Sequence, residues 1–326
     1  MTWDPLELRD RLRGALAFPV TPFLADLSLD ERGFSANADR LAASGVVAIV
    51  VAGGTGEFHA LAPAEILRLC ALAVDAVSGR VPVIVGVGLS AATARALAAG
   101  CEEAGADGLL MMPAAYGRAE DEGLYAYYAA IATSVRIGTF PYARDHAVLS
   151  PALVARLAAL PNVVAFKDGH GDLRLWKRIR EAVGTDLRWL AGVGDDLAPQ
   201  YFSAGAEGFT SSIANLDPAL AVRLYELASG GDIAGAEELV ARRIAPIYAL
   251  RGRRRGYEVA SIKQAMTRVG LPAGPVRPPL VPVADAELPE LDRALRRLAE
   301  ADDGGRRAPS GNERRQPVAT GERRSA

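Results

Sequence analysis

Residues 163–169 are Val-Val-Ala-Phe-Lys-Asp-Gly, four apolar residues followed by a lysine at the point where the run ends. The run has the length of a short buried strand and is bounded by Pro-Asn at 161–162 and by Gly-His-Gly at 169–171. A lysine at the C-terminal end of a buried strand is unusual, because an ammonium group buried without a partner is costly. Two interpretations are open. Lys167 either reaches the surface or pairs with Asp168, or it is a Schiff-base lysine whose amine is made nucleophilic by desolvation.

Strand-length apolar runs recur along the chain, and most lack polar alternation, as strands buried on both faces should. The eight runs are Gly14–Val20, Val46–Ala52, Val81–Val87, Gly108–Pro113, Ile137–Tyr142, Val163–Lys167, Leu187–Val193 and Glu207–Ile213. Helix-period sequence lies between them and carries its own start signals, such as Ser-Leu-Asp-Glu at 28–31, Ser-Pro at 150–151 and Asp-Pro at 217–218. Eight strands alternating with eight helices predict an α/β fold, the (β/α)8 TIM barrel. A doubly wound open sheet is the alternative, but evenly spaced units without a second domain favour closure.

The barrel is expected over residues 1–230, followed by a C-terminal helical extension over residues 231–301. Helical sequence in the extension is predicted at Ile233–Leu250, Arg253–Val269 and Ala284–Ala301, with a Pro-rich segment from Pro272 to Pro282. Residues 302–326 are rich in Gly, Pro, Ser and Arg and contain Val318 as their one large apolar residue. Because such a segment cannot bury enough surface to order itself, we expect a disordered tail.

Composition excludes several classes of function. Half of the 326 residues are hydrophobic but only 6% are aromatic, so the core must be mostly aliphatic. A net charge of -2 predicts neither a nucleic-acid footprint nor attraction to an anionic membrane. No run approaches 18 uninterrupted apolar residues, so a soluble, cytoplasmic protein is expected.

Cysteines and histidines show no metal-binding pattern. Cys70 and Cys101 fall on the apolar faces of predicted helices, where packing is the expected role. The three histidines, His59, His146 and His170, lie in separate loops and form no zinc motif.

The site of a (β/α)8 barrel lies at the C-terminal ends of its strands. After the second run, residues 53–57 are Gly-Gly-Thr-Gly-Glu. The bare backbone N–H groups around Gly54 and the hydroxyl of Thr55 can hold an anionic oxygen, such as that of a substrate carboxylate. The alternative is a glycine-rich turn that only reverses the chain.

The fifth and eighth runs also end in polar side chains. Tyr142 can transfer protons and Arg144 can hold a carboxylate with two hydrogen bonds. The alternatives are a rim aromatic for Tyr142 and an ion pair with Asp145 for Arg144. Beyond the eighth run, residues 210–215 (Thr-Ser-Ser-Ile-Ala-Asn) offer small polar donors beside the predicted cavity.

An amine, a phenol, an anion cradle and a guanidinium around one opening suit imine chemistry. A keto acid would be held by its carboxylate while its carbonyl condenses with Lys167. The amine must be neutral to attack, yet a free lysine has a pKa of about 10.4. A dry barrel interior can lower the pKa of the lysine toward roughly 7–8, and a shift of that size corresponds to a free energy of about 4 kcal/mol. The chemistry requires no metal and no organic cofactor.

These motifs resemble those of the dihydrodipicolinate synthase / N-acetylneuraminate lyase superfamily of Schiff-base (β/α)8 enzymes. The resemblance covers roughly Arg13 to Gly270. It is carried in the expected order by residues 18–23 (Phe-Pro-Val-Thr-Pro-Phe), residues 53–57, Tyr142 and residues 166–169 (Phe-Lys-Asp-Gly).

Within the superfamily, three details resemble the 5-dehydro-4-deoxyglucarate dehydratases. The Gly-Gly-Thr-Gly-Glu at 53–57 replaces the Gly-Thr-Thr-Gly-Glu of dihydrodipicolinate synthases, which removes a hydroxyl from the proton relay of those enzymes. Residues 142–148 (Tyr-Ala-Arg-Asp-His-Ala-Val) are similar to the dehydratase sequence Tyr-Asn-Arg-Asp-Asn-Ala-Val. Residues 253–257 and 261–263 also resemble its C-terminal helices.

The resemblance implies a role for each matching residue. Lys167 would form the Schiff base, Tyr142 would transfer protons, and Gly54 and Thr55 would bind the carboxylate beside the keto group. The distal polar end of a sugar diacid is assigned to Arg144, Ser212 and Asn215. The implied reaction is dehydration and decarboxylation to 2,5-dioxopentanoate, water and carbon dioxide, and the implied assembly is a homodimer or homotetramer.

The sequence also departs from that pattern. Ala143 and His146 stand where the dehydratases show asparagines, and Tyr116 lies one place from the usual tyrosine and receives no role. Residues 192–196 (Gly-Val-Gly-Asp-Asp) resemble the synthase and lyase pattern. Two other functions are therefore weighed: a pyruvate-releasing aldolase for 2-keto-3-deoxy sugar acids, and a non-catalytic sugar-acid sensor on the same scaffold.

Overall fold

The computed structural model describes residues 3–114 and 118–300. The predicted tail over 302–326 and Tyr116 lie outside these ranges. Within them, no helix has both the length and the apolar character needed to cross a membrane.

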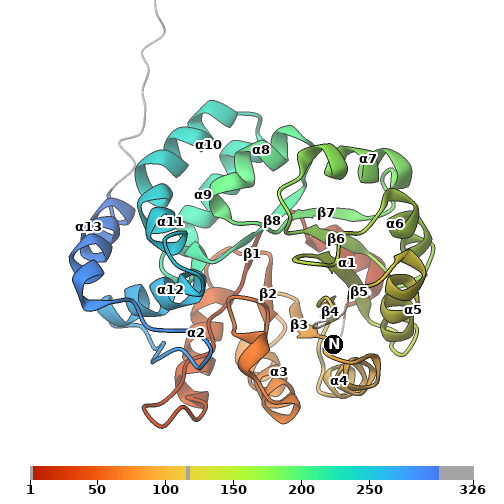
Figure 1. Cartoon of the computed structure of the whole chain (residues 1–326), viewed down its shortest axis with the longest axis horizontal. Helices are drawn as coiled ribbons and strands as arrows, with labels where there is room; N and C mark the ends of the chain where they lie inside the picture. Colours follow the sequence, from red (N-terminus) through yellow and green to blue (C-terminus); the bar gives the residue numbers. More distant parts are fainter. Residues whose placement is uncertain (1–2, 115–117, 301–326) are drawn as a thin grey trace, which may run out of the picture.

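Eight parallel strands close into a barrel in chain order, with β8 paired to β1 (Figure 1). The strands are β1 (Ala15–Ala17), β2 (Ala48–Val51), β3 (Val83–Val87), β4 (Gly108–Met111), β5 (Gly138–Ala143), β6 (Ala165–Asp168), β7 (Arg188–Ala191) and β8 (Gly208–Ser211). The predicted TIM barrel is thereby confirmed. Most strands are shorter than the predicted apolar runs, because the outer residues of each run continue into the loops at the barrel ends.

A ring of helices surrounds the barrel and buries its outer face (Figure 1). They are α2 (Glu31–Ala42), α3 (Pro63–Val77), α4 (Ala91–Glu103), α5 (Asp121–Ala132), α6 (Pro151–Ala158), α7 (Leu173–Val183), α8 (Ala198–Ser203) and α9 (Pro218–Ser229). Ser150 and Asp217 cap α6 and α9 as the sequence predicted. At α2 the cap is Asp30, whose carboxylate accepts from the N–H of Gly33, while Ser28 donates to Asp26. Short polar side chains at these positions satisfy N–H groups that the helix leaves free.

A short helix, α1 (Pro5–Arg11), precedes β1 and was not predicted from the charged opening of the chain. Its Leu8 is fully buried at the N-terminal ends of β4 and β5. Gly108 and Gly138 begin those strands, and a Cβ on either would lie 2.6 or 2.7 Å from the Leu8 side chain. The helix therefore closes this end of the barrel, and the opposite end carries the opening.

The extension consists of α10 (Ile233–Leu239), a π-helical turn (Val240–Ile244), α11 (Ala245–Arg251), α12 (Tyr257–Arg268) and α13 (Leu288–Leu298). The first predicted helix is interrupted because Pro246 has no N–H for the carbonyl of residue 242. The N–H of Ala245 bonds instead to the carbonyl of Val240, one residue further back. Figure 1 shows these helices beside α9 and α2. Buried residues of the extension, such as Ile247 and Met266, share one hydrophobic cluster with the barrel, so the division at residue 230 stays a prediction.

Candidate active site

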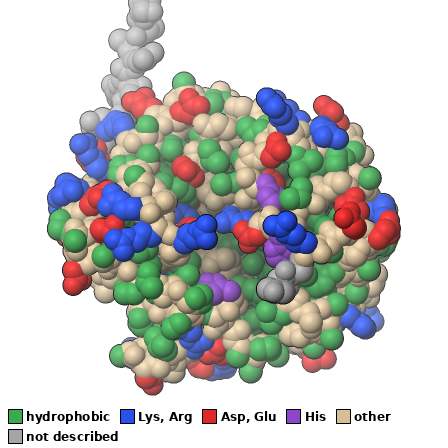
Figure 2. All heavy atoms as spheres, in the orientation of Figure 1, with side chains coloured by type: hydrophobic (Ala, Val, Ile, Leu, Met, Phe, Trp, Pro, Cys, Tyr) green, Lys and Arg blue, Asp and Glu red, His purple; other side chains and the backbone are tan. Residues whose placement is uncertain are grey.

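A cavity of about 550 Å³ opens at the C-terminal ends of the strands. Figure 2 shows it as a hollow at the centre of this face, with basic, acidic and histidine side chains around it. The volume is in the range of small-molecule sites. The structure brings six of the seven predicted site residues to its wall: Lys167, Tyr142, Gly54, Thr55, Arg144 and Ser212.

Lys167 lies on β6 with only 3% of its surface exposed. Its Nζ is 3.6 Å from the centroid of the Tyr142 ring and 4.3 Å from that of Phe18. Within the described residues, no hydrogen bond or ion pair reaches this amine. Asp168 points to the other face of the strand, where its carboxylate accepts from the hydroxyl of Tyr201 and the N–H of His170. Lys167 is therefore neither a surface lysine nor the ion-pair partner of Asp168.

Burial holds the pKa of Lys167 well below its usual range, because the apolar surroundings disfavour the ammonium form. The positive charge of Arg144 lowers the pKa further, and Asp168 opposes the shift only in part. The aromatic faces of Phe18 and Tyr142 favour the cation, by about 2 kcal/mol or more per desolvated contact, and so oppose the shift in part. Loss of hydration costs several kcal/mol per ion, so the neutral, nucleophilic amine is favoured.

Two glycines leave room for this arrangement. A Cβ on Gly192, at the end of β7, would lie 2.6 Å from Cε of Lys167, and a Cβ on Gly169 would lie 2.7 Å from the Tyr142 ring. Any side chain at either position would displace a reacting group. Gly169 and Gly192 belong to the stretches 166–169 and 192–196 noted in the sequence, but the sequence analysis assigned neither glycine a role.

Tyr142 is the register partner of Lys167 on the neighbouring strand β5, so both side chains point to the same side of the sheet. Burial raises the pKa of its phenol, and Arg144 opposes that shift. Nη1 of Arg144 donates to the phenol oxygen at 3.4 Å. The phenol is therefore protonated at neutral pH, and a cation stands ready to stabilise the phenolate once the proton leaves.

Arg144 makes the ion pair with Asp145 that the sequence left open, and it also contacts Tyr142. Its Nε lies 3.4 Å from the exposed carboxylate of Asp145, and its Nη1 reaches Tyr142. An exposed ion pair of this kind is worth less than about 1 kcal/mol. The guanidinium consequently acts on the reacting groups, Lys167 and Tyr142, and can still contact a ligand.

The loop after β2 lies across the barrel from Lys167. Ala52 and Glu57 have φ values of 51° and 57°, which turn the backbone at both ends of the loop. Within the described residues, no hydrogen bond engages the backbone N–H groups of Gly54 and Thr55. The loop thus presents free donors to the cavity, as an anion cradle requires.

The two predicted residues after β8 differ from each other. Ser212 lines the cavity, where its Oγ accepts a hydrogen bond from Arg251. Asn215 is fully buried, and its amide donates to the carbonyls of Phe18 and Ser212 while its oxygen accepts from the N–H of Val20. With both amide hydrogens used by the backbone, Asn215 links the segment after β8 to the segment after β1, and the predicted substrate contact is not supported.

Several lining residues were missed by the sequence analysis. His59 lines the cavity from a short 3-10 helix (Phe58–Ala60) and His146 from the turn after β5, while Arg251 and Glu258 line it from the extension. Because no motif linked the extension to the strand ends, the sequence carried no signal for the last two. Among the described residues, no cluster of three or more His, Cys, Asp or Glu side chains is arranged to hold a metal ion.

A sequence model of the dihydrodipicolinate synthetase family matches residues 11–298, nearly the whole described chain. The chain belongs to this family. The resemblance noted from its motifs is confirmed.

Relatives in the dihydrodipicolinate synthetase family include proteins named "Probable 5-dehydro-4-deoxyglucarate dehydratase". One from Bradyrhizobium diazoefficiens is 40% identical over 288 residues, which cover 87% of this chain and 92% of that protein. Another from Saccharopolyspora erythraea is 37% identical, covering 89% of this chain and 95% of that protein.

Solved structures of the family share the fold. Dihydrodipicolinate synthase from Oceanobacillus iheyensis has a TM-score of 0.85 at 29% identity, covering 90% of this chain and 98% of that one. A synthase from Acinetobacter baumannii, crystallised with pyruvate, has a TM-score of 0.82 at 28% identity, covering 88% and 99% of the two chains.

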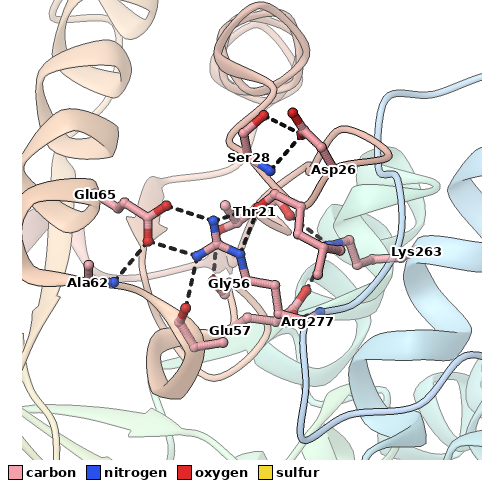
Figure 3. A network of polar contacts seen from close by, with 11 residues as sticks. Thr21, Asp26, Ser28, Gly56, Glu57, Ala62, Glu65, Lys263 and Arg277 are labelled. Atoms are coloured by element: carbon pink, nitrogen blue, oxygen red, sulfur yellow. Dashed lines mark hydrogen bonds and ion pairs between the residues drawn. The ribbon is translucent and has the colours of Figure 1, made fainter.

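In this family member, a buried ion pair connects the anion cradle to the extension (Figure 3). The carboxylate of Glu57, at the end of the cradle, is fully buried and lies 2.7 Å from Nζ of Lys263 on α12. Lys263 also donates to the carbonyls of Thr21 and Pro275 at 2.8 and 2.6 Å. The second oxygen of Glu57 accepts from the N–H of Arg277 at 2.9 Å.

Each polar atom of the pair is therefore satisfied. Burial lowers the pKa of Lys263 to about 8, and the charge of Glu57 opposes that shift. The side chain of Arg277 adds a two-pronged contact to Glu65 at the start of α3, at 2.6 and 2.7 Å. The segment after α12 thus holds the loop that carries Gly54 and Thr55.

We predict that Lys263→Met lowers the free energy of unfolding by about 3–5 kcal/mol, because the Glu57 carboxylate is left buried without its partner. The double variant Lys263→Met/Glu57→Gln should lose less free energy of unfolding than the sum of the losses for Lys263→Met alone and Glu57→Gln alone. Urea denaturation measures both, with Arg68→Met as the control, since it removes an exposed ion pair with Glu31. A cost for Lys263→Met no larger than that of the control would contradict this account.

Proposed function

We propose that the protein is a Schiff-base lyase that converts 5-dehydro-4-deoxy-D-glucarate to 2,5-dioxopentanoate, water and carbon dioxide. The observation that carries the proposal is the buried amine of Lys167, which has no partner in the described structure and lies against Tyr142. The names of the relatives support a dehydratase. The family supports a lyase on a small-molecule substrate.

Binding would begin at the keto-acid end of the substrate. The free N–H groups of Gly54 and Thr55 would receive the carboxylate beside the keto group, which places that carbonyl between the cradle and Lys167. The pyruvate complex of the Acinetobacter baumannii synthase supports a keto acid as ligand of this fold.

Imine formation needs one proton for the departing oxygen. Lys167 attacks the carbonyl carbon, and Tyr142 protonates the hydroxyl of the resulting carbinolamine, which leaves as water. The products are a protonated imine and a phenolate next to Arg144. The phenolate then removes a proton from the methylene carbon beside the imine, and the electron pair of that bond moves to the nitrogen.

Elimination follows from the enamine. Its electrons return to form a carbon–carbon double bond as the adjacent hydroxyl takes the proton from Tyr142 and leaves as water. The conjugated imine then accepts the electron pair of the bond to the distal carboxylate, which leaves as carbon dioxide. Proton uptake at the chain carbons, conversion of the enol to the aldehyde and hydrolysis of the imine release 2,5-dioxopentanoate and restore Lys167.

We predict that Lys167→Ala abolishes turnover without unfolding the barrel, because no other amine faces the cavity from the described residues. Borohydride should trap the keto acid on the Lys167 peptide of the wild type, detected as an adduct by peptide mass. Turnover by Lys167→Ala, or absence of an adduct in the wild type, would contradict the mechanism, and the latter would favour a sensor. Pyruvate in place of carbon dioxide among the products would favour the aldolase.

We predict that Tyr142→Phe lowers kcat by about 10²- to 10⁴-fold, since one phenol serves the proton transfers of imine formation, deprotonation and elimination. KM should change little, because the phenol does not bind the carboxylate. Steady-state kinetics measure both, with Tyr225→Phe as a control on α9, away from the cavity. An unchanged kcat would remove Tyr142 from the mechanism.

The assembly of the protein as a dimer or tetramer and its cytoplasmic location stay predictions.

A further inference from the structure

The extension forms one wall of the cavity next to β8. Arg251, at the end of α11, lines it together with Glu258 and Val259 of α12. The barrel strands alone therefore do not complete the site. Among the described residues of this wall, Arg251 is the one that carries a positive charge.

The guanidinium of Arg251 is held in place by Ser212, which follows β8, and by Tyr248 of its own helix α11. Its Nη1 donates to Oγ of Ser212 at 2.7 Å, and its central carbon lies 4.0 Å from the centroid of the Tyr248 ring. The hydroxyl of Tyr248 in turn donates to the carboxylate of Asp195 at 2.7 Å and accepts from the N–H of Asp195. A planar cation fixed by stacking and by one hydrogen bond keeps its remaining donors oriented.

Those remaining donors are not used by the protein. Within the described residues, Arg251 forms no ion pair, and its Nε is buried without a hydrogen-bond partner. The two nearby carboxylates do not neutralise it by contact. Asp195 is fully buried and accepts from Ser211, Ser212 and Tyr248, while Asp196 interacts with Arg251 only through its charge.

The position of Arg251 differs from that of Arg144. Arg144 follows β5 and contacts Tyr142, so its charge acts where the imine forms. Arg251 contacts the end of β8, and β7 and β8 lie on the other side of β6 from β5. A ligand whose keto-acid end is bound by the loop after β2 and by Lys167 can therefore extend its far end toward either cation.

We propose that Arg251 binds the far carboxylate of the substrate and so sets the preference for keto diacids over keto acids that end in an alcohol. The inference rests on the proposed function for the identity of the diacid, but it requires only binding and no imine. Arg144 carries the charge beside the reacting carbon. The fork of Arg251 matches a carboxylate and loses little conformational freedom when it binds one.

Calorimetric titration in a Lys167→Ala background tests the proposal, because the diacid then binds without being turned over. The ligands are 5-dehydro-4-deoxyglucarate and the matching keto-deoxy acid with a primary alcohol in place of the far carboxylate. Lys167→Ala should bind the diacid at least about 10-fold more tightly than the alcohol, as expected for a charged hydrogen-bonded pair. Adding Arg251→Met should abolish the preference and leave the affinity for the alcohol unchanged, and adding Arg251→Lys should restore part of it.

A control variant, Arg255→Met, removes an exposed charge from the same segment and should keep the preference. A preference retained in Arg251→Met overturns the proposal, as does an equal loss of affinity for both ligands, which indicates a structural role. Loss of the preference in Arg144→Met but not in Arg251→Met would assign the far carboxylate to Arg144. Failure of borohydride trapping in the wild type would overturn the imine mechanism and leave this binding result interpretable.

Discussion

The proposed chemistry depends on one constraint: the amine of Lys167 is buried away from water, and no hydrogen bond or ion pair within the described residues reaches it. A buried ammonium is normally paired or hydrogen-bonded, because its lost hydration costs several kcal/mol. Here the amine lies against the rings of Phe18 and Tyr142, and the charge that shifts its pKa most is the cation of Arg144. Burial and the charge of Arg144 both disfavour protonation of the amine. The barrel therefore disfavours the ammonium form of Lys167 and favours the neutral, nucleophilic amine. Activity should rise as the pH increases through the lowered pKa of Lys167.

The chain has a second buried lysine in the opposite situation. Lys263 is as inaccessible as Lys167, but it meets a carboxylate and two carbonyl oxygens. Its partner Glu57 ends the loop that carries the anion cradle. The surroundings of each lysine decide its role. The fully hydrogen-bonded ammonium of Lys263 fixes a loop, whereas the amine of Lys167, without partners in the described structure, is available to a ligand. The extension thus supports the cradle through Lys263 and supplies the far wall of the cavity through Arg251.

Much of this could be predicted from the sequence. The eight apolar runs indicate the barrel, because a strand that is buried on both faces cannot carry a polar residue at every second position. Lys167 is recognisable because an ammonium buried in such a run without a partner is costly, although the run alone left a surface position or a pair with Asp168 open. Tyr142 and Thr55 follow from their places at strand ends. Asn215 illustrates the limit: the sequence placed it beside the cavity, whereas the structure shows it fully buried, with its amide used by the backbone after β1. The role of Arg251 could not be predicted from the sequence, because its contact with Ser212 arises from packing between segments that are distant in the chain.

The most direct test of the central claim is the titration of Lys167 itself. The chain has three lysines, Lys167, Lys177 and Lys263, so NMR of protein carrying ¹³Cε-lysine gives three signals that single substitutions assign. Lys177 is exposed and serves as the internal reference. The account predicts that the Lys167 signal titrates well below that of Lys177, with the amine neutral while the reference is still charged. A midpoint for Lys167 at or above that of Lys177 would contradict it.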